Sequence, residues 1–153
     1  MSPPARCLLL LLLLLLLLLL LGASAAGAGG PRLARLRYDL WRTDSPGRVD
    51  RHSLRLVVAS GTAFYDVMLL AANLSRAYRF EAEMVNGAKY VNSIGGRTKN
   101  EEQKKHWMFY KLQSAPNPAK PPPDILLTPK GINGVFVSDR DIYLFWFKNV
   151  TWA

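Results

Sequence analysis

Hydrophobic and polar residues alternate with a period of two in several short segments, which is typical of β-strands with one buried and one solvated face. Leu36, Tyr38 and Leu40 alternate with charged residues, and a second apolar run covers residues 54–59. Residues 44–47 read Asp-Ser-Pro-Gly, a combination that favours turns. The pattern therefore predicts an opening β-hairpin with a long loop.

A single segment has the period of a helix. Apolar residues recur at the i, i+3, i+4 and i+7 positions of one helical face: Phe64, Val67, Met68 and Ala71. Thr62 is a favourable N-cap residue, and Asp66 lies near the positive end of the helix dipole. We expect the helix to be capped by Thr62 and to fade over residues 73–76.

The period of two returns after the helix and predicts strands over residues 78–84, 90–94, 106–112 and 142–147. Asn86-Gly87 is a strong signal for a tight turn between the first two of these strands. Polar residues 97–105 predict a surface loop, and the five prolines of residues 116–123 exclude a helix or a central strand. Residues 125–128 predict a brief edge strand.

The last predicted strand is apolar on both faces. Its two alternating sets of side chains are Ile142, Leu144 and Trp146 on one side, and Tyr143, Phe145 and Phe147 on the other. A strand of this kind is expected to be central and covered on both sides. The order of elements predicts an α+β, mostly β fold, in which a small sheet or sandwich of short strands packs against one helix.

The chain has 153 residues, and fourteen consecutive leucines at positions 8–21 follow Arg6. A short charged start, an apolar run and small residues after it are typical of a secretory signal peptide. The run is shorter than the ~20 apolar residues that span a membrane. We expect a signal peptide over residues 1–25, a basic N-terminal arm and first strand over residues 26–52, and one β-rich domain over residues 53–153. The mature protein is then secreted, extracellular and free of the membrane.

Cys7 is the single cysteine and lies in the predicted leader. A mature chain without cysteine has no disulfide, no thiol nucleophile and no cysteine-based zinc site. Two N-x-S/T sequons begin at Asn73 and Asn149. In a secreted protein both asparagines are candidate glycosylation sites.

The sequence contains none of the common catalytic motifs. It lacks the G-x-S-x-G nucleophile elbow, a glycine-rich phosphate loop and the H-E-x-x-H zinc motif. His52 and His106 are far apart, and neither has a second ligand at metal-binding spacing. We therefore expect neither an enzyme, nor a metal site, nor a covalently bound cofactor.

The formal net charge is +9, and six arginines fall within residues 32–51. Such a cluster can bind nucleic acid, anionic glycans or a membrane surface. Because the chain is expected to be secreted, an anionic glycan is the favoured partner of this cluster and nucleic acid is not expected. The favoured interpretation, however, is that these arginines form the solvated face of a strand and a flexible arm without such a partner.

Large aromatic side chains gather in the predicted strands of the second half: Tyr90, Trp107, Phe109, Tyr110, Trp146 and Phe147. Most of them are expected to be core residues. A minority at strand ends beside glycine-rich turns are candidates for a shallow apolar ligand surface. Aromatic side chains stack on flat macrocycles and sugars, and periodicity alone does not separate core from ligand surface.

Four pieces of the sequence, in order, resemble a known family. They are Ser60-Gly61-Thr62 followed by residues 67–72, Tyr90-Val91-Asn92-Ser93-Ile94, Trp107-Met108-Phe109-Tyr110, and residues 142–147. Their order and spacing resemble the C-terminal β-domain of the cobalamin (vitamin B12) carriers: transcobalamin, intrinsic factor and haptocorrin. The resemblance covers most of the chain after residue 54.

The resemblance implies a ligand and a set of contacts. In that family a helical α-domain holds one side of cobalamin and the β-domain closes over the other side, largely through its backbone. Carried over by position, the contacts are Gly87, Ala88, Lys89, Tyr90, Val91, Trp107, Met108, Phe109 and Tyr110. This chain departs from the pattern by adding Lys89 and by being too short for an α-domain, so we expect a partner to supply the second wall.

Three functions remain open from the sequence. The favoured one is a secreted, non-enzymatic module that binds or transports cobalamin or a related corrinoid, with a protein partner or receptor. The second is an extracellular protein-interaction domain that has lost the ligand. The third is a secreted factor that binds polyanions through the arginines of residues 32–51.

Overall fold

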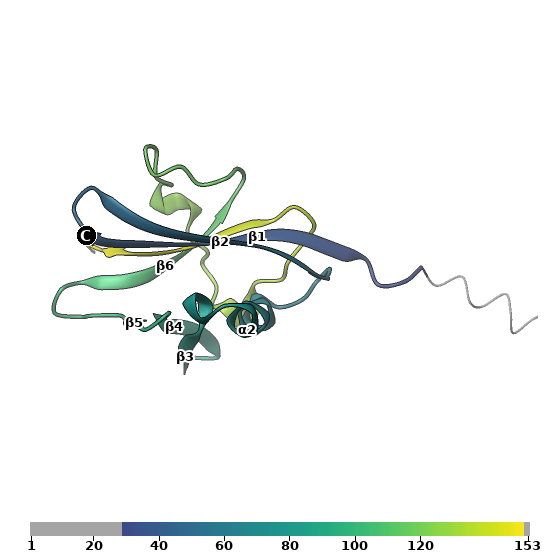
Figure 1. The fold of residues 1–153 in the computed structure, drawn as a ribbon. Coiled ribbons are helices and arrows are strands. Elements are labelled where there is room, and N and C mark those ends of the chain that lie inside the picture. Colours follow the sequence, from purple (N-terminus) through teal and green to yellow (C-terminus); the bar gives the residue numbers. More distant parts are fainter. Residues whose placement is uncertain (1–28, 152–153) are drawn as a thin grey trace, which may run out of the picture. The chain divides into compact units, whose positions relative to one another are not determined.

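The computed structural model describes residues 29–151, and a compact unit begins at Arg32 (Figure 1). The predicted signal peptide lies outside the described residues and stays a prediction. The elements are β1 (Leu33–Ser45), β2 (Arg48–Ala59), α2 (Phe64–Leu74), η1 (Arg76–Tyr78), β3 (Phe80–Val85), β4 (Ala88–Ile94), β5 (Arg97–Thr98), β6 (Lys105–Leu112), η2 (Asp124–Leu126), η3 (Ile132–Gly134) and β7 (Ile142–Asn149). The predicted α+β, mostly β class is confirmed.

β1 and β2 form a long antiparallel hairpin in which Leu33 pairs with Ala59 and Ser45 with Arg48. Its turn is short, because Gly47 adopts a φ of 81° that reverses the chain directly after Pro46. The predicted long loop is wrong. The strands continue through the arginine-rich stretch because β2 is an edge strand, where polar side chains reach solvent. The boundary expected between residues 52 and 53 falls inside β2.

Four strands form the large sheet, in the order β2-β1-β7-β6. β7 lies parallel to β1 and antiparallel to β6, so that Ile142 is opposite both Arg37 and Leu112. One face, here called inner, carries Tyr143 and Phe145 into a core with α2 and the β3-β4-β5 sheet. The other, outer face carries Leu144 into a second core. The prediction that this strand is central and covered on both sides is confirmed.

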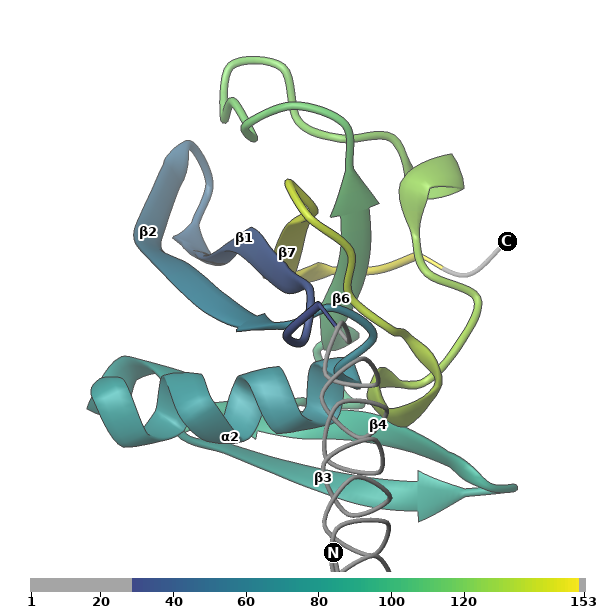
Figure 2. The ribbon, with the colours of Figure 1, turned by 90° about the vertical axis from the view of Figure 1, so that its right-hand side faces the viewer.

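The helix packs on the inner face, on the same side of the large sheet as β3, β4 and β5 (Figures 1 and 2). Its predicted apolar face is buried as expected: Phe64, Val67, Met68 and Ala71. The expected cap is wrong, because Ala63 occupies the N-cap position and the Thr62 hydroxyl donates instead to the Ala59 carbonyl at 2.6 Å. Within residues 29–151 no helix is both long and apolar enough to cross a membrane.

The small sheet has the order β3-β4-β5. Asn86 and Gly87 have φ values of 49° and 80°, which is the geometry of a tight hairpin turn and confirms the predicted turn. β3 begins two residues later than expected, because Tyr78 ends a 3₁₀ turn and its hydroxyl donates to the buried Tyr38 carbonyl at 3.1 Å. The predicted loop 97–105 starts with the short strand β5, which pairs with β4.

The proline-rich segment after β6 contains no named strand, as expected, and leads into η2. Leu126 and Leu127 pack against the outer core. The predicted brief edge strand at residues 125–128 is reduced to one isolated bridge between Leu127 and Tyr110. This segment therefore covers part of the outer face, as Figure 1 shows above the large sheet.

Buried tyrosines should make the fold sensitive to alkali. Burial raises the pKa of Tyr38, Tyr78, Tyr110 and Tyr143, and hydrogen bonds to Asp124 and Asp141 raise the last two further. The folded state holds these protons more tightly than the unfolded chain does. The free energy of unfolding therefore keeps its full value below the ordinary tyrosine pKa of about 10 and falls as the pH rises above it. We expect tyrosinate absorbance to appear together with unfolding. Gradual ionisation of all six tyrosines without unfolding would contradict this.

Candidate functional site

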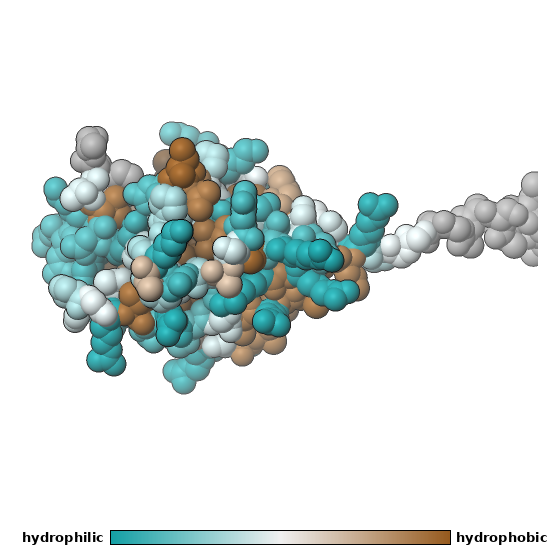
Figure 3. Space-filling view, turned by 90° about the horizontal axis from the view of Figure 1, so that it is seen from above, coloured by the Kyte–Doolittle hydropathy of each residue, from teal (hydrophilic) through white to brown (hydrophobic). Residues whose placement is uncertain are grey.

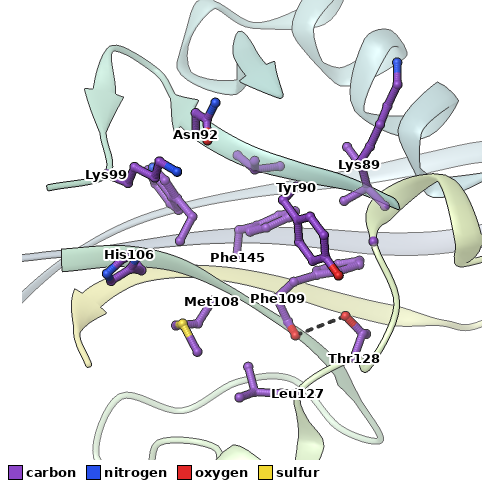
Figure 4. Close-up of a pocket in the computed structure, with 14 residues that line it drawn as sticks. Lys89, Tyr90, Asn92, Lys99, His106, Met108, Phe109, Leu127, Thr128 and Phe145 are labelled. Carbon is purple, nitrogen blue, oxygen red and sulfur yellow. Dashed lines mark hydrogen bonds between the residues drawn. The ribbon is translucent and has the colours of Figure 1, made fainter. Parts of the chain in front are cut away.

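A cavity of about 320 Å³ lies between β4 and β6, at the junction of the two sheets (Figure 4). Its floor is aromatic: Trp107 and Phe109 of β6 and Phe145 of β7. Phe109 and Phe145 stack with ring centroids 4.5 Å apart, and Trp107 donates from Nε1 to the Arg97 carbonyl at 2.7 Å. These contacts hold the rings in place. All three residues are buried, and the exposed fraction of Trp107 is 7%.

β4 forms one wall of the cavity through residues 89–92. The Lys89 backbone nitrogen donates to Asn133 Oδ1 at 2.8 Å, and Asn133 Nδ2 donates to the Gly87 carbonyl at 3.0 Å. The Lys89 ammonium lies 3.8 Å from the centre of the Tyr65 ring, so its side chain runs towards α2 and only its inner part lines the cavity. Tyr90 stands at the rim with 47% of its surface exposed.

The opposite wall comes from the segment before η3. Thr128 donates to the Phe109 carbonyl from its backbone nitrogen at 2.9 Å and from Oγ1 at 3.4 Å, which fastens this segment to β6. Gly131 lies directly against the Lys89 backbone, where a Cβ atom would be 2.6 Å from the Lys89 oxygen. A residue with any side chain would therefore separate the two walls.

Polar groups surround one end of the cavity. Lys99 Nζ is 2.9 Å from Glu83 Oε1, and His106 Nε2 is 3.5 Å from Glu101 Oε2. The hydrogen bond to Glu83 raises the pKa of Lys99, and the same bond lowers the pKa of Glu83. Asn92 Oδ1 is buried and accepts no hydrogen bond from the described residues. The cavity thus offers an apolar floor with a charged, hydrogen-bonding margin.

The structure brings together six of the nine positions implied by the family resemblance. Lys89, Tyr90, Val91, Trp107, Met108 and Phe109 line the cavity. Gly87 and Ala88 line a neighbouring depression beside Asn133 instead. Met108 and Tyr110 both belong to the outer core, because alternate residues of a strand face opposite sides. Met108 still lines the cavity, whereas Tyr110 does not and its hydroxyl donates to Asp124 at 2.7 Å. The role of these residues in ligand binding stays a prediction.

Eight lining residues are absent from the predicted set: Asn92, Lys99, His106, Leu127, Thr128, Gly131, Ile132 and Phe145. The sequence pattern could have identified Phe145, because this residue alternates with the outer-core residues of the last strand and therefore lies on the inner face. Asn92 continues the strand that carries Tyr90. The residues of the 127–132 segment follow no hydrophobic period, so no sequence signal placed them at the cavity.

The remaining candidate residues lie elsewhere. His52 is close to Arg42 and Asp50, away from the cavity. Asn73 in the last turn of α2 and Asn149 at the end of β7 are exposed, and their glycosylation stays a prediction. Across residues 29–151, no three His, Cys, Asp or Glu side chains gather in a way that could hold a metal ion.

Comparison with curated proteins gives one distant relative. No protein-family model matches the chain. The uncharacterized Drosophila melanogaster protein CG3556 is 29% identical over 113 residues, which are 74% of this chain and 19% of the fly protein. The chain therefore spans about a fifth of the length of this relative.

Solved structures give a clearer result for the fold. Haptocorrin in complex with Cbi matches with a TM-score of 0.61 and 15% identity, over 84% of this chain and 28% of that chain. A Ruminococcus gnavus protein with a proposed metal-binding role matches with a TM-score of 0.50 and 11% identity, over 77% of this chain and 99% of that chain. At such identities the matches establish the fold alone. This chain therefore has a fold like the β-domain of the cobalamin carriers.

Proposed function

We propose that this chain is a non-enzymatic binding module for a corrinoid such as cobalamin, and that a partner protein supplies the second wall of the site. The observation that carries the proposal is the cavity between β4 and β6, where the two segments implied by the family resemblance meet. It is supported by the similar fold of haptocorrin, which was solved in complex with Cbi.

The size and lining of the cavity suit one edge of a corrinoid. A volume of about 320 Å³ is much smaller than a whole substituted corrin ring, so most of the ligand would remain outside. The half-exposed Tyr90 ring can stack on a flat macrocycle, while the buried floor contacts its edge. A second wall that buries a few hundred Å² more apolar surface would contribute several kcal/mol to the binding free energy, at ~25 cal/mol per Å². Without that wall, this contribution is lost. We therefore expect weak, saturable binding by this chain alone.

Titration of the full chain with Cbi and with cobalamin tests the proposal. Binding should change the tryptophan fluorescence, because Trp107 lines the cavity. Tyr90→Ala should weaken binding by about five- to thirtyfold, corresponding to ~1–2 kcal/mol of lost ring contact. Calorimetry gives the dissociation constants independently of the fluorescence.

Phe136→Ala is the matched control for this titration. Phe136 is also a large exposed ring, 59% exposed, but it does not line the cavity. Its replacement should leave binding unchanged. A lack of saturable binding to the unaltered chain, or equal losses in both variants, would contradict the proposal.

A further inference from the structure

A second concave surface lies on the outer face of the large sheet, near the start of β1, with a volume of about 480 Å³. Four arginines surround it: Arg35, Arg37, Arg55 and Arg140. We call this surface the arginine groove. Figure 3 looks onto the outer face and shows hydrophilic side chains beside apolar surface on the side where β1 begins. The groove shares no residue with the cavity described above.

The strand register explains why these arginines meet. Arg37 lies opposite Arg55 of β2 and Ile142 of β7, and Arg35 lies opposite Val57. Residues opposite one another in a sheet share a face, so all of these side chains project on the same side. The segment that follows β6 covers the other half of this face, and only Ala115 from that segment reaches the groove.

The four guanidinium groups differ in their partners. Arg37 is held by the buried Asp39 carboxylate, with Nε–Oδ2 and Nη2–Oδ1 distances of 2.6 and 3.0 Å. Arg140 is 92% exposed and lies 3.9 Å from Asp139. Among the described residues, the side chains of Arg35 and Arg55 form no hydrogen bond or ion pair. The groove thus carries two uncommitted positive charges.

The carboxylate that lines the groove already has partners of its own. Asp141 lines it, but its Oδ2 accepts a hydrogen bond from the Tyr143 hydroxyl at 2.7 Å and lies 3.0 Å from Lys111 Nζ. The Asp141 carboxylate therefore does not neutralise Arg35 or Arg55. An incoming anion would meet free guanidinium groups, which bind carboxylates through paired N–H donors.

The floor between the arginines is apolar. The apolar side chains on this face are Val57, with 57% of its surface exposed, and Ile142. Leu36 and Leu56 also line the groove, but their side chains are buried in the inner core. A sulfated glycan would match the charges and leave this floor without a partner. A small molecule would keep one side in water, because the groove is open to solvent, unlike the enclosed sites that bury most of a small ligand. The lining fits a chain with both carboxylates and aliphatic side chains.

We propose that the arginine groove docks an extended acidic segment of a partner protein that also carries aliphatic side chains. Arg35 and Arg55 are diagonal neighbours in the sheet, a relation that separates positions by about 7–8 Å. Alternate residues of an extended peptide are about 6.6–6.8 Å apart. Two carboxylates at positions i and i+2 would therefore each reach one free guanidinium group, with aliphatic residues further along contacting Val57.

Fluorescence anisotropy with a labelled peptide, Ser-Val-Ser-Glu-Ser-Glu-Ser-Val-Ser, tests this docking on the full chain. Replacing both Arg35 and Arg55 with serine should weaken binding by about tenfold or more. Val57→Ser should weaken it as well, because the aliphatic contact is lost. The same peptide with lysine in place of glutamate should not bind.

A charge-matched variant, Arg76→Ser with Lys120→Ser, is the control, since both residues are exposed and lie outside the groove. It should bind the peptide as the unaltered chain does. The proposal is overturned if the peptide does not bind, or if the control variant loses as much affinity. It is also overturned if a heparin oligosaccharide binds through Arg35 and Arg55, independently of Val57, while the peptide does not. None of these outcomes depends on corrinoid binding.

Discussion

Phe64→Ala should lower the free energy of unfolding by about 3–5 kcal/mol. The Phe64 ring is fully buried at the start of α2 and contacts rings from three strands of the large sheet. Its centroid lies 5.1 Å from that of Tyr38, 4.7 Å from Phe109 and 4.5 Å from Tyr143. Truncation leaves a cavity that these rigid rings cannot fill. Urea unfolding followed by tryptophan fluorescence measures the loss.

Leu70→Ala is the control for this prediction. Leu70 lies on the same helix but is 37% exposed, so its truncation should cost less than about 1 kcal/mol. A similar loss in the two variants would mean that Phe64 does not join the helix to the large sheet in the way that the ring contacts indicate.

Gly131→Ala should destabilise the fold by about 1–3 kcal/mol and weaken ligand binding. The new Cβ atom would lie 2.6 and 2.7 Å from the oxygen and nitrogen of Lys89, and 3.0 Å from the Ala88 Cβ. The backbone of β4 cannot yield without moving the whole strand. The wall that carries Tyr90 would then shift relative to the aromatic floor. Chemical unfolding and corrinoid titration of the same variant measure the two effects.

Gly134→Ala is a close control, because both glycines flank or belong to η3. A Cβ atom at position 134 would meet only the flexible Lys130 side chain, at 3.5 Å or more. Its stability and ligand affinity should therefore match those of the unaltered chain. If Gly131→Ala behaved in the same way, the contact between η3 and β4 would not set the width of the cavity.

The sequence predicts most of the fold because its strands carry strict alternation. The apolar residues at 142–147 alone predict a strand between two cores, and Asn86-Gly87 predicts the turn between β3 and β4. Alternation did not predict the full length of β2, because the polar side chains of an edge strand resemble those of a loop. Thr62 has the chemistry of a cap, yet its hydroxyl binds the preceding turn instead.

The candidate site was predicted less completely for a different reason. The family resemblance implies contacts from the contiguous run 107–110, but a strand sends alternate side chains to opposite faces, and Met108 and Tyr110 both lie in the outer core. The opposite wall depends on hydrogen bonds from Thr128 and on the close approach of Gly131. These are long-range contacts of an aperiodic segment, and local sequence patterns contain no information about them.

The position of β7 has a consequence for how the chain folds. This strand follows every other described element, yet it occupies the centre of the large sheet, between β1 and β6. Pairing it with β1 closes a loop of about a hundred residues, from Arg37 to Ile142, and the entropy of that closure is lost before the contacts form. During synthesis on a ribosome, the first hairpin and β6 are therefore made before the strand that pairs with them. Their edges stay unpaired in this period, and chaperones would protect the nascent chain from aggregation.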